Sequence, residues 1–178
     1  QHPVNGTLFT RLQEGELAEN LDAVYAEDIN GNTVYQYTSN ATAGVQVDGS
    51  KITYTNLFPY ADLSYTQGSD GRKLDLVINS QQFLNNLPAN AQFLVLKEKI
   101  TLPNGWTVLE NEHGLNVYAA GKWMANFPQP IATETISPLK SYENDADLMV
   151  NGEVSKSLNG NVLTVYTKFP INWLRHSS

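Results

Sequence analysis

Asn-Gly and Asp-Gly pairs constrain the fold of this chain more than any other feature of the sequence. Seven of them occur in 178 residues, at 5–6, 30–31, 48–49, 70–71, 104–105, 151–152 and 159–160. Most lie between short runs rich in Val, Ile, Tyr, Thr and Leu. Both central residues of a type I′ turn have positive φ, which these pairs adopt readily, and the twist of that turn matches the strands it joins. The pairs therefore predict type I′ hairpins of antiparallel strands.

The runs between these turns predict a series of hairpins from residue 23 onward. Val45 and Val47 recur at period two, as do Leu74, Leu76 and Ile78, which is typical of a sheet with one buried face. We expect hairpins that join 24–28 to 33–38, 45–47 to 51–55, 63–66 to 73–78, 99–102 to 106–110, and 115–119 to 122–127. An edge strand is expected over 131–136. Residues 147–150, 153–158 and 161–166 are expected to pair across the last two Asn-Gly turns.

The predicted fold class is all-β, an antiparallel β-sandwich built from consecutive hairpins, in a single domain over 1–178. At most one short helix is expected near residues 80–88, with Ser80 as its N-cap and Pro88 at its end. Residues 1–22 fit either a strand or a helix interrupted by Gly15, and we favour a strand over 7–12. Residues 1–22 and 175–178 are expected to be peripheral or to derive from an expression tag.

Composition argues against several classes of function. The formal net charge is −7 and the 11 basic residues are scattered, whereas binding to nucleic acid requires clustered Lys and Arg. No apolar run approaches the roughly 18 residues that a membrane-spanning helix needs, so no membrane span is expected. Cysteine is absent, which excludes disulfides, a thiol nucleophile and a cysteine zinc site.

One segment carries a family resemblance. Residues 52–65, ITYTNLFPYADLSY, place an aromatic, a Phe-Pro pair and Asp62-Leu63 ahead of a strand, and the charged and apolar run 72–78 follows a loop. This arrangement resembles a region of large secreted or surface proteins of bacteria, including wall-associated and RHS/YD-repeat proteins. The run 163–166 with Trp173-Leu174 is similar to the closing strand of that region, so the resemblance covers about residues 45–174. It implies a non-catalytic module of a large exported protein.

Catalytic and metal-binding motifs are weak in this sequence. No nucleophile elbow, zinc-protease helix or P-loop occurs, and of the three histidines only His113, near Glu110 and Glu112, is away from the ends of the chain. Asp28, Asn30 and Asn32 place oxygen-bearing side chains at alternate positions around Gly31, like the start of a calcium loop, although position twelve is Ser39 instead of Glu. The same residues also fit a simple hairpin turn. We therefore expect no cofactor, with calcium as the one alternative considered.

Aromatic residues offer a binding hypothesis. They make up 10% of the chain, and β-sandwich modules bind sugars by stacking rings on aromatic faces. The candidate ligand-binding residues are Trp106, Trp123, Tyr118 and Tyr60, while Tyr35 and Tyr37 form either a small platform or half of a buried face. The leading interpretation is a non-catalytic structural or adhesive module of an exported bacterial surface protein, extracellular or at the cell surface. Its partners would be neighbouring domains or cell-surface glycans. The alternative is a carbohydrate-binding module, and a glycoside hydrolase stays open.

Overall fold

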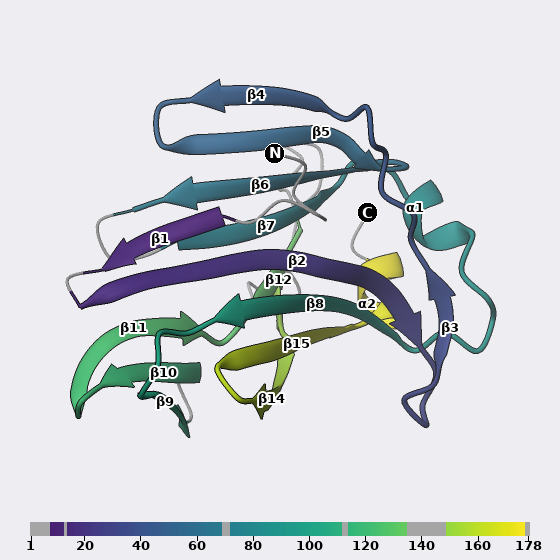
Figure 1. The fold of residues 1–178 in the computed structure, drawn as a ribbon. Helices are drawn as coiled ribbons and strands as arrows, with labels where there is room; N and C mark the ends of the chain where they lie inside the picture. Colours follow the sequence, from purple (N-terminus) through teal and green to yellow (C-terminus); the bar gives the residue numbers. More distant parts are fainter. Residues whose placement is uncertain (1–7, 13, 69–71, 112–113, 135–148, 177–178) are drawn as a thin grey trace.

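The protein folds into antiparallel β-sheets, as Figure 1 shows for a computed structural model that describes residues 8–12, 14–68, 72–111, 114–134 and 149–176. The predicted all-β class is confirmed. Sheet A runs through the middle of the molecule, sheet B lies above it in Figure 1, and sheet C lies below it. A small pair of strands, sheet D, completes the described part of the chain.

Sheet A is assembled from strands that are distant in the sequence. Its order from edge to edge is β1 (Leu8–Leu12), β2 (Gly15–Glu27), β8 (Phe93–Thr101), β15 (Val162–Pro170) and β14 (Glu153–Asn159). A further strand, β3 (Thr33–Gln36), pairs with the C-terminal end of β2. Since β8 occupies the other edge of β2 from Ala18 to Glu27, β1 and β3 share one edge of that strand.

Sheets B and C are meanders of consecutive strands. Sheet B contains β4 (Gly44–Asp48), β5 (Lys51–Phe58), β6 (Ala61–Gln67) and β7 (Arg72–Ile78). Sheet C contains β9 (Trp106–Asn111), β10 (Gly114–Ala119) and β11 (Lys122–Pro128). Sheet D pairs β12 (Ile131–Thr133) with β13 (Met149–Asn151). Hairpin connections inside each meander follow from the turn residues between alternating runs.

One face of sheet A is buried along its whole length. Leu94, Leu96 and Ile100 alternate along β8 and therefore point to the same side, which we call the inner face. Leu94 and Leu96 share a core cluster with Leu57, Phe58 and Leu63 of sheet B. Ile100 shares a second core cluster with Leu115 and Val117 of sheet C. Two other sheets thus cover successive halves of one apolar face, as expected for a sandwich.

A bulge changes the phase of β2 in the middle of this face. The register with β8 shifts between Leu21 and Ala23, so the buried positions pass from Leu17 and Leu21 to Val24. A bulge inserts one extra residue into a strand and turns its neighbours to the opposite side. The extra residue is Asp22, which lies on the outer side of sheet A. Residues 15–22, which we expected to be peripheral, therefore belong to a central strand with fully buried leucines.

The turns follow the predicted positions but not the predicted backbone type. Gly31, Gly49, Gly105 and Gly160 have positive φ, while the Asn or Asp before each of them does not. A type I′ turn requires positive φ at both central residues. Both residues are positive at Ala120 and Gly121, with φ of 48° and 80°. Among the described turns, Ala120-Gly121 therefore has positive φ at both central residues, as a type I′ turn requires. No described Asn-Gly or Asp-Gly pair does.

Two predicted hairpins are wrong. Residues 99–102 and 106–110 flank Asn104-Gly105, yet they lie in different sheets, because β8 pairs with β2 and β15 whereas β9 pairs with β10. Strand β13 pairs with β12 and not with β14, so Asn151-Gly152 is a connection between sheets and not a hairpin. The other pairings predicted from residue 23 to residue 127 are present.

Two short helices close one end of the sandwich. The predicted one is α1 (Gln82–Asn85), but its N-cap is Gln81, not Ser80, and no side chain caps it. Ser80 Oγ instead accepts the backbone N–H of Gln82 at 3.2 Å. The other, α2 (Ile171–His176), lies beside it, and Arg175 donates to the carbonyl of Leu84 at 3.3 Å. No N-cap signal precedes α2 in the sequence, and this helix was not predicted, whereas residues 163–166, which the resemblance gave as a closing strand, lie in β15. Ile171 is buried in the core that sheets A and B share.

Candidate functional site

The outer face of sheet C combines aromatic and amide side chains, among which Trp123 is exposed, Tyr118 and Asn126 are half-buried and Asn116 is buried. On β10, Leu115 and Val117 point into the core, so Asn116 and Tyr118 point away from it. The register pairs Asn116 with Asn126 and Tyr118 with Trp123 on β11. A bulge after Val117 brings Trp123, in place of Met124, opposite Tyr118. We call Asn116, Tyr118, Trp123 and Asn126 the Trp123 surface.

Trp123 is exposed and held in one orientation. Its side chain is 52% exposed, yet the indole Nε1–H donates to Asn116 Oδ1 at 3.1 Å. Asn126 donates its Nδ2 to the same oxygen at 3.2 Å. Asn116 is itself only 9% exposed, so the acceptor is fixed by the surrounding strands. An indole that is fixed before binding loses less side-chain entropy when a ligand covers it.

This geometry suits a ligand that is apolar on one face and polar at its rim. The face of an aromatic ring carries partial negative charge and attracts the C–H groups of a pyranose ring. Asn126 lies in the same row, where its side-chain carbonyl oxygen can accept hydrogen bonds from sugar hydroxyls while its Nδ2 group donates to Asn116 Oδ1 and the carbonyl of Leu115. Leu109, opposite Asn116 and 60% exposed, extends the apolar part of the surface.

The structure brings together two of the four aromatic residues predicted as ligand-binding. Tyr118 and Trp123 are cross-strand neighbours. Trp106 lies opposite Ala119, on the core side of sheet C, where it packs against the cluster around Leu115. Tyr60 is exposed but belongs to sheet B, in the tight turn between β5 and β6, with φ of 66°. Asn116 and Asn126 were missed because single amides in a strand carry no sequence signal.

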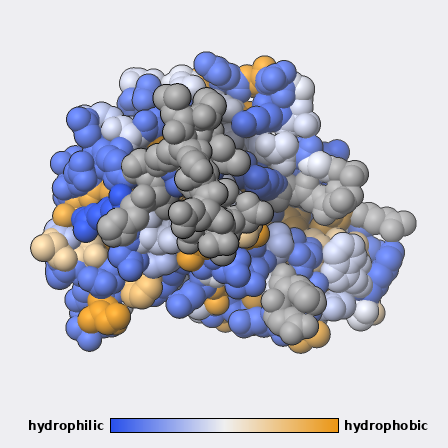
Figure 2. Space-filling view, turned by 180° about the vertical axis from the view of Figure 1, so that it is seen from behind, coloured by the Kyte–Doolittle hydropathy of each residue, from blue (hydrophilic) through white to orange (hydrophobic). Residues whose placement is uncertain are grey.

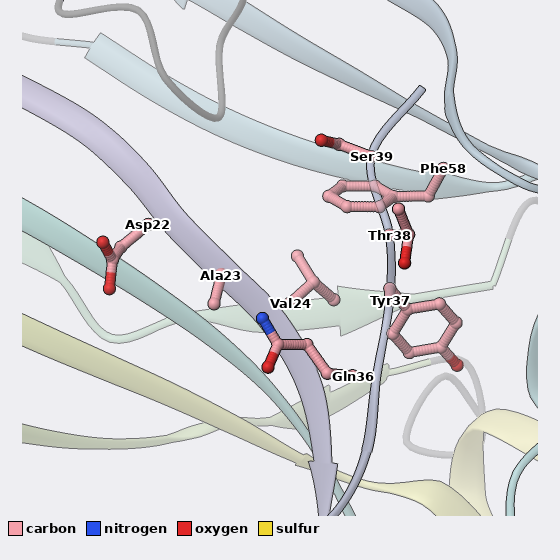
Figure 3. A pocket seen from close by; sticks show the side chains of 8 residues that line it. All are labelled: Asp22, Ala23, Val24, Gln36, Tyr37, Thr38, Ser39 and Phe58. Atoms are coloured by element: carbon pink, nitrogen blue, oxygen red, sulfur yellow. The ribbon is translucent and has the colours of Figure 1, made fainter. Parts of the chain in front are cut away.

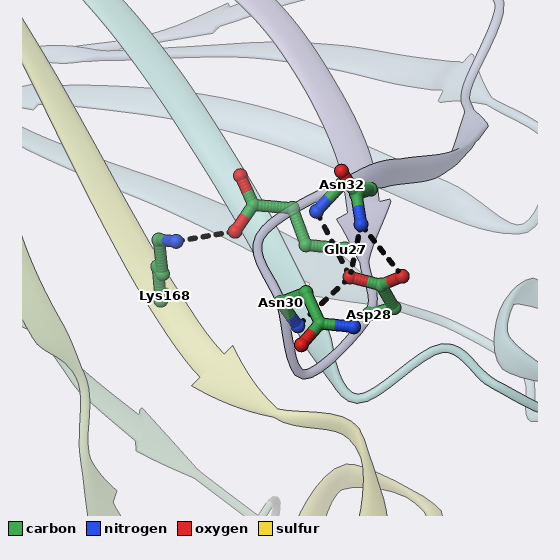
Figure 4. A network of polar contacts seen from close by, with 5 residues as sticks. All are labelled: Glu27, Asp28, Asn30, Asn32 and Lys168. Carbon is green, nitrogen blue, oxygen red and sulfur yellow. Dashed lines mark hydrogen bonds and ion pairs between the residues drawn. The ribbon is translucent and has the colours of Figure 1, made fainter.

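The predicted calcium residues form a hydrogen-bonded turn (Figure 4). Asp28 Oδ1 accepts hydrogen bonds from the backbone N–H groups of Asn30 and Asn32, both at 2.9 Å. The side-chain amide of Asn32 donates to both carboxylate oxygens, at 3.2 and 3.1 Å. These bonds, led by the side-chain donor of Asn32, lower the pKa of Asp28. A cation would compete with these donors for the carboxylate, and calcium binding stays a prediction.

Asp28→Ala is expected to lower the melting temperature equally in calcium and in chelator, because the turn loses the same hydrogen bonds in both. Circular dichroism during heating measures this. Asn30→Ala is the matched control, since Asn30 contributes its backbone N–H to the turn. A chelator that destabilises the wild-type protein, together with an Asn30→Ala effect seen in calcium alone, would show that the turn holds a cation.

A partly buried ion pair lies beside this turn (Figure 4). Glu27, the last residue of β2, is buried and pairs with Lys168 of β15. Burial, together with the charge of Glu27 and a hydrogen bond to it, raises the pKa of Tyr25 to about 12. Glu27 thus has two polar partners in a buried position, the ammonium group of Lys168 and the hydroxyl of Tyr25. The ion pair joins β2 to β15 across the strand between them, β8.

Two adjoining hollows lie beside β2 and share Asp22, Ala23 and Gln36. One, of about 300 Å³, reaches Tyr37 and Phe58 (Figure 3), and the other, of about 460 Å³, reaches Lys97 and Tyr166. This polar region was not predicted, because its residues come from strands far apart in the sequence.

Asp22 is the central charge of these hollows. Its carboxylate binds Lys97 Nζ at 2.7 Å and Lys99 Nζ at 2.9 Å. Burial raises the pKa of Asp22, but the hydrogen bonds and charges of the two lysines lower it by more, so its pKa lies below the ordinary value. The pKa of Lys97 is raised by the same hydrogen bond. Asp22 therefore remains ionised and serves as a counter-ion on the outer face of sheet A.

Other candidates concern parts of the chain that the structure does not describe. His113 and Glu112 lie outside the described residues, whereas Glu110 is the fifth residue of β9. Within the described residues, no three His, Cys, Asp or Glu side chains gather closely enough to hold a metal ion. The described helices are all too short or too polar to cross a membrane. The chain matches no protein-family model, no curated protein and no solved structure.

Proposed function

We propose that this protein is a non-catalytic adhesive module that binds saccharides through the Trp123 surface. The observation that carries the proposal is an exposed indole whose orientation is fixed by a buried amide, Asn116. A large aromatic side chain that is exposed at 52% loses the stabilisation that burial would supply. Ligand binding would explain why the indole of Trp123 is kept at the surface. Tyr118 and Asn126 supply a second ring and a polar rim beside it.

The charges of the described hollows support a binding role over hydrolysis. Glycoside hydrolysis requires a carboxylic acid whose pKa is raised, paired with a second carboxylate. Asp22, which lines both hollows, has a lowered pKa and lies between two lysines. It is therefore poorly suited to donate a proton at neutral pH.

The wider setting rests on the resemblance over residues 45–174. It supports a place in a large exported protein of a bacterial surface, with neighbouring domains and cell-surface glycans as partners. Within the motif, Asp62 Oδ1 accepts the backbone N–H of Asn56 at 2.7 Å, a structural role at the corner between β5 and β6. The motif would then shape the module, and the Trp123 surface would supply its contact with glycans.

Trp123→Ala is expected to weaken saccharide binding at least tenfold, which corresponds to about 1.4 kcal/mol. A panel of neutral and acidic polysaccharides first identifies a ligand, and calorimetry then compares the variants. Tyr60→Ala is the matched control, because it removes an exposed aromatic side chain from a different sheet. Folding of each variant is checked by circular dichroism and by the melting temperature.

Two results would contradict saccharide binding at the Trp123 surface. A protein that binds nothing in the panel, or that binds equally well after Trp123→Ala, would be a scaffold whose surface tryptophan has no ligand. Loss of binding in Tyr60→Ala instead would move the site to sheet B.

A further inference from the structure

The free edge of sheet B is a regular strand with little to prevent further pairing. Strand β4 pairs with β5 through five consecutive residues without a bulge, and no described strand pairs with its other edge. All five residues are exposed. The strand contains no proline and no charge before Asp48. Unpaired N–H and C=O groups along such an edge form a template for another strand.

Other edges in the described part of the chain are protected. Charged residues occur on the outer strands of the larger sheets, namely Arg11 on β1, Lys73 and Asp75 on β7, Glu110 on β9, Lys122 on β11 and Lys156 on β14. The register between β2 and β3 is broken by a bulge, and β12 and β13 are only three residues long. Charges, bulges and short strands are the usual means of preventing edge pairing. Strand β4 uses none of them over its first four residues.

Two apolar rows of sheet B end at this edge. One row runs through Leu74, Tyr65 and Ile52 to Val47, and the other runs through Leu76, Leu63 and Tyr54 to Val45. Tyr54, Leu63 and Tyr65 are buried in the core, whereas Val45 and Val47 are 59% and 71% exposed. The inner face of sheet B thus continues past the part that sheet A covers. Figure 2 shows a mostly hydrophilic surface with small apolar patches, one at the upper margin, the side where Figure 1 places β4.

We propose that β4 pairs with β4 of a second copy of this chain, antiparallel and with the two-fold axis at Gln46. In that register Val45 of each copy lies opposite Val47 of the other, so the two apolar rows continue into the second molecule. Gln46 meets its own counterpart on the outer face, where the two amides can exchange hydrogen bonds. Asp48 lies opposite Gly44, so no like charges face each other.

The self-complementary pattern is what favours a second copy over an unrelated strand. A two-fold interface brings the same segment of both molecules together, and it closes as a dimer without further growth. The pattern Gly-Val-Gln-Val-Asp satisfies this requirement around its central residue. The dimer is independent of saccharide binding, although it would present two Trp123 surfaces and so raise avidity for a polymeric glycan.

Sedimentation velocity at increasing protein concentration tests the association. The wild-type chain is expected to reach twice its monomer mass at micromolar concentration. Val45→Lys/Val47→Lys places like charges opposite each other and is expected to weaken the dimer about 100-fold. Leu158→Lys, an exposed residue on the edge strand β14, is the matched control and should leave the dimer unchanged. A wild-type monomer at every concentration overturns the proposal, as does equal loss of the dimer in the control.

Cysteine cross-linking tests the register independently, since the chain contains no cysteine. Gln46→Cys brings the two thiols opposite each other at the two-fold axis, within disulfide distance, and is expected to give a covalent dimer on oxidation. Val45→Cys is the matched control. Residue 45 of one copy lies diagonally across the axis from residue 45 of the other, and their Cα atoms are farther apart than the roughly 7 Å that a disulfide allows. Absence of the Gln46→Cys dimer, or equal cross-linking of Val45→Cys, rules out this pairing.

Discussion

Replacing Tyr37 with alanine is expected to lower the free energy of unfolding by about 4 kcal/mol or more. The ring is 7% exposed and stacks on Phe83 with 4.1 Å between centroids and 6° between planes. It also contacts Phe58 and Tyr35 edge-on. Its hydroxyl donates to the carbonyl of Phe83 at 2.8 Å. One side chain therefore ties the segment after β3 to α1 and to sheet B, and its removal leaves a cavity and an unsatisfied carbonyl.

Tyr37→Phe separates these two contributions. It keeps the ring and removes the hydroxyl, so the expected loss is about 1 to 2 kcal/mol. Urea denaturation followed by tryptophan fluorescence gives both values. If Tyr37→Ala costs no more than Tyr37→Phe, the stacking on Phe83 contributes little and the core at this end of the sandwich is loosely packed. The interpretation of Tyr35 and Tyr37 as a binding platform is wrong for Tyr37, which is buried in the core.

Gly114→Ala is expected to destabilise the protein by about 3 to 5 kcal/mol, since it combines backbone strain with a steric clash. Gly114 has φ of 122°, a conformation that L side chains rarely adopt. A Cβ atom there would lie 2.1 Å from the carbonyl oxygen of Phe127, with backbone carbons of Phe127 and Pro128 at 3.0 Å. Strand β11 would have to move away from β10, and the Trp123 surface, which is built from these two strands, would move with it.

Gly121→Ala is the control within the same pair of strands. Its φ is also positive, at 80°, but no atom lies within 4 Å of the position that a Cβ would take. The expected cost is about 1 kcal/mol from the backbone alone. Urea denaturation and saccharide binding are measured for both variants. Equal costs for the two substitutions would mean that the contact with Phe127 relaxes easily, and unchanged saccharide binding in Gly114→Ala would separate the site from this strand pair.

Local pattern predicted the meanders well and the central sheet poorly. In sheets B and C, neighbouring strands are consecutive, so each hairpin is encoded by a turn and two alternating runs. In sheet A, β8 lies between β2 and β15, and no local signal specifies those partners. The bulge at Asp22 adds to the difficulty, because it places the buried Leu21 and Val24 three residues apart and so interrupts the alternation of β2. The apolar residues of the first 22 positions also fit one stripe of a helix that Gly15 interrupts, so the sequence favoured a strand there without excluding a helix.

Some residues of the candidate site could be identified from the sequence, whereas others became apparent only from the pairing of strands. Trp123 and Tyr118 were chosen for their side chains, and the turn at Ala120-Gly121 placed them on paired strands. Whether each aromatic residue is exposed depends on which face of its sheet the core covers, and this separates Trp123 from Trp106. The group of Asp22, Lys97 and Lys99 joins strands that are more than 70 residues apart. Such groups arise only when the strands pair.

The residues alone determined that this chain is all-β and where most of its reversals lie, because glycine conformation and side-chain alternation act over a few neighbouring positions. The tertiary structure decided which strands share a sheet, which tryptophan faces solvent and which sheet edge has no neighbour among the described strands. Those outcomes depend on how separate apolar faces cover one another. Which sheet buries the apolar face of another is decided when the sheets assemble, and a short stretch of sequence does not specify it.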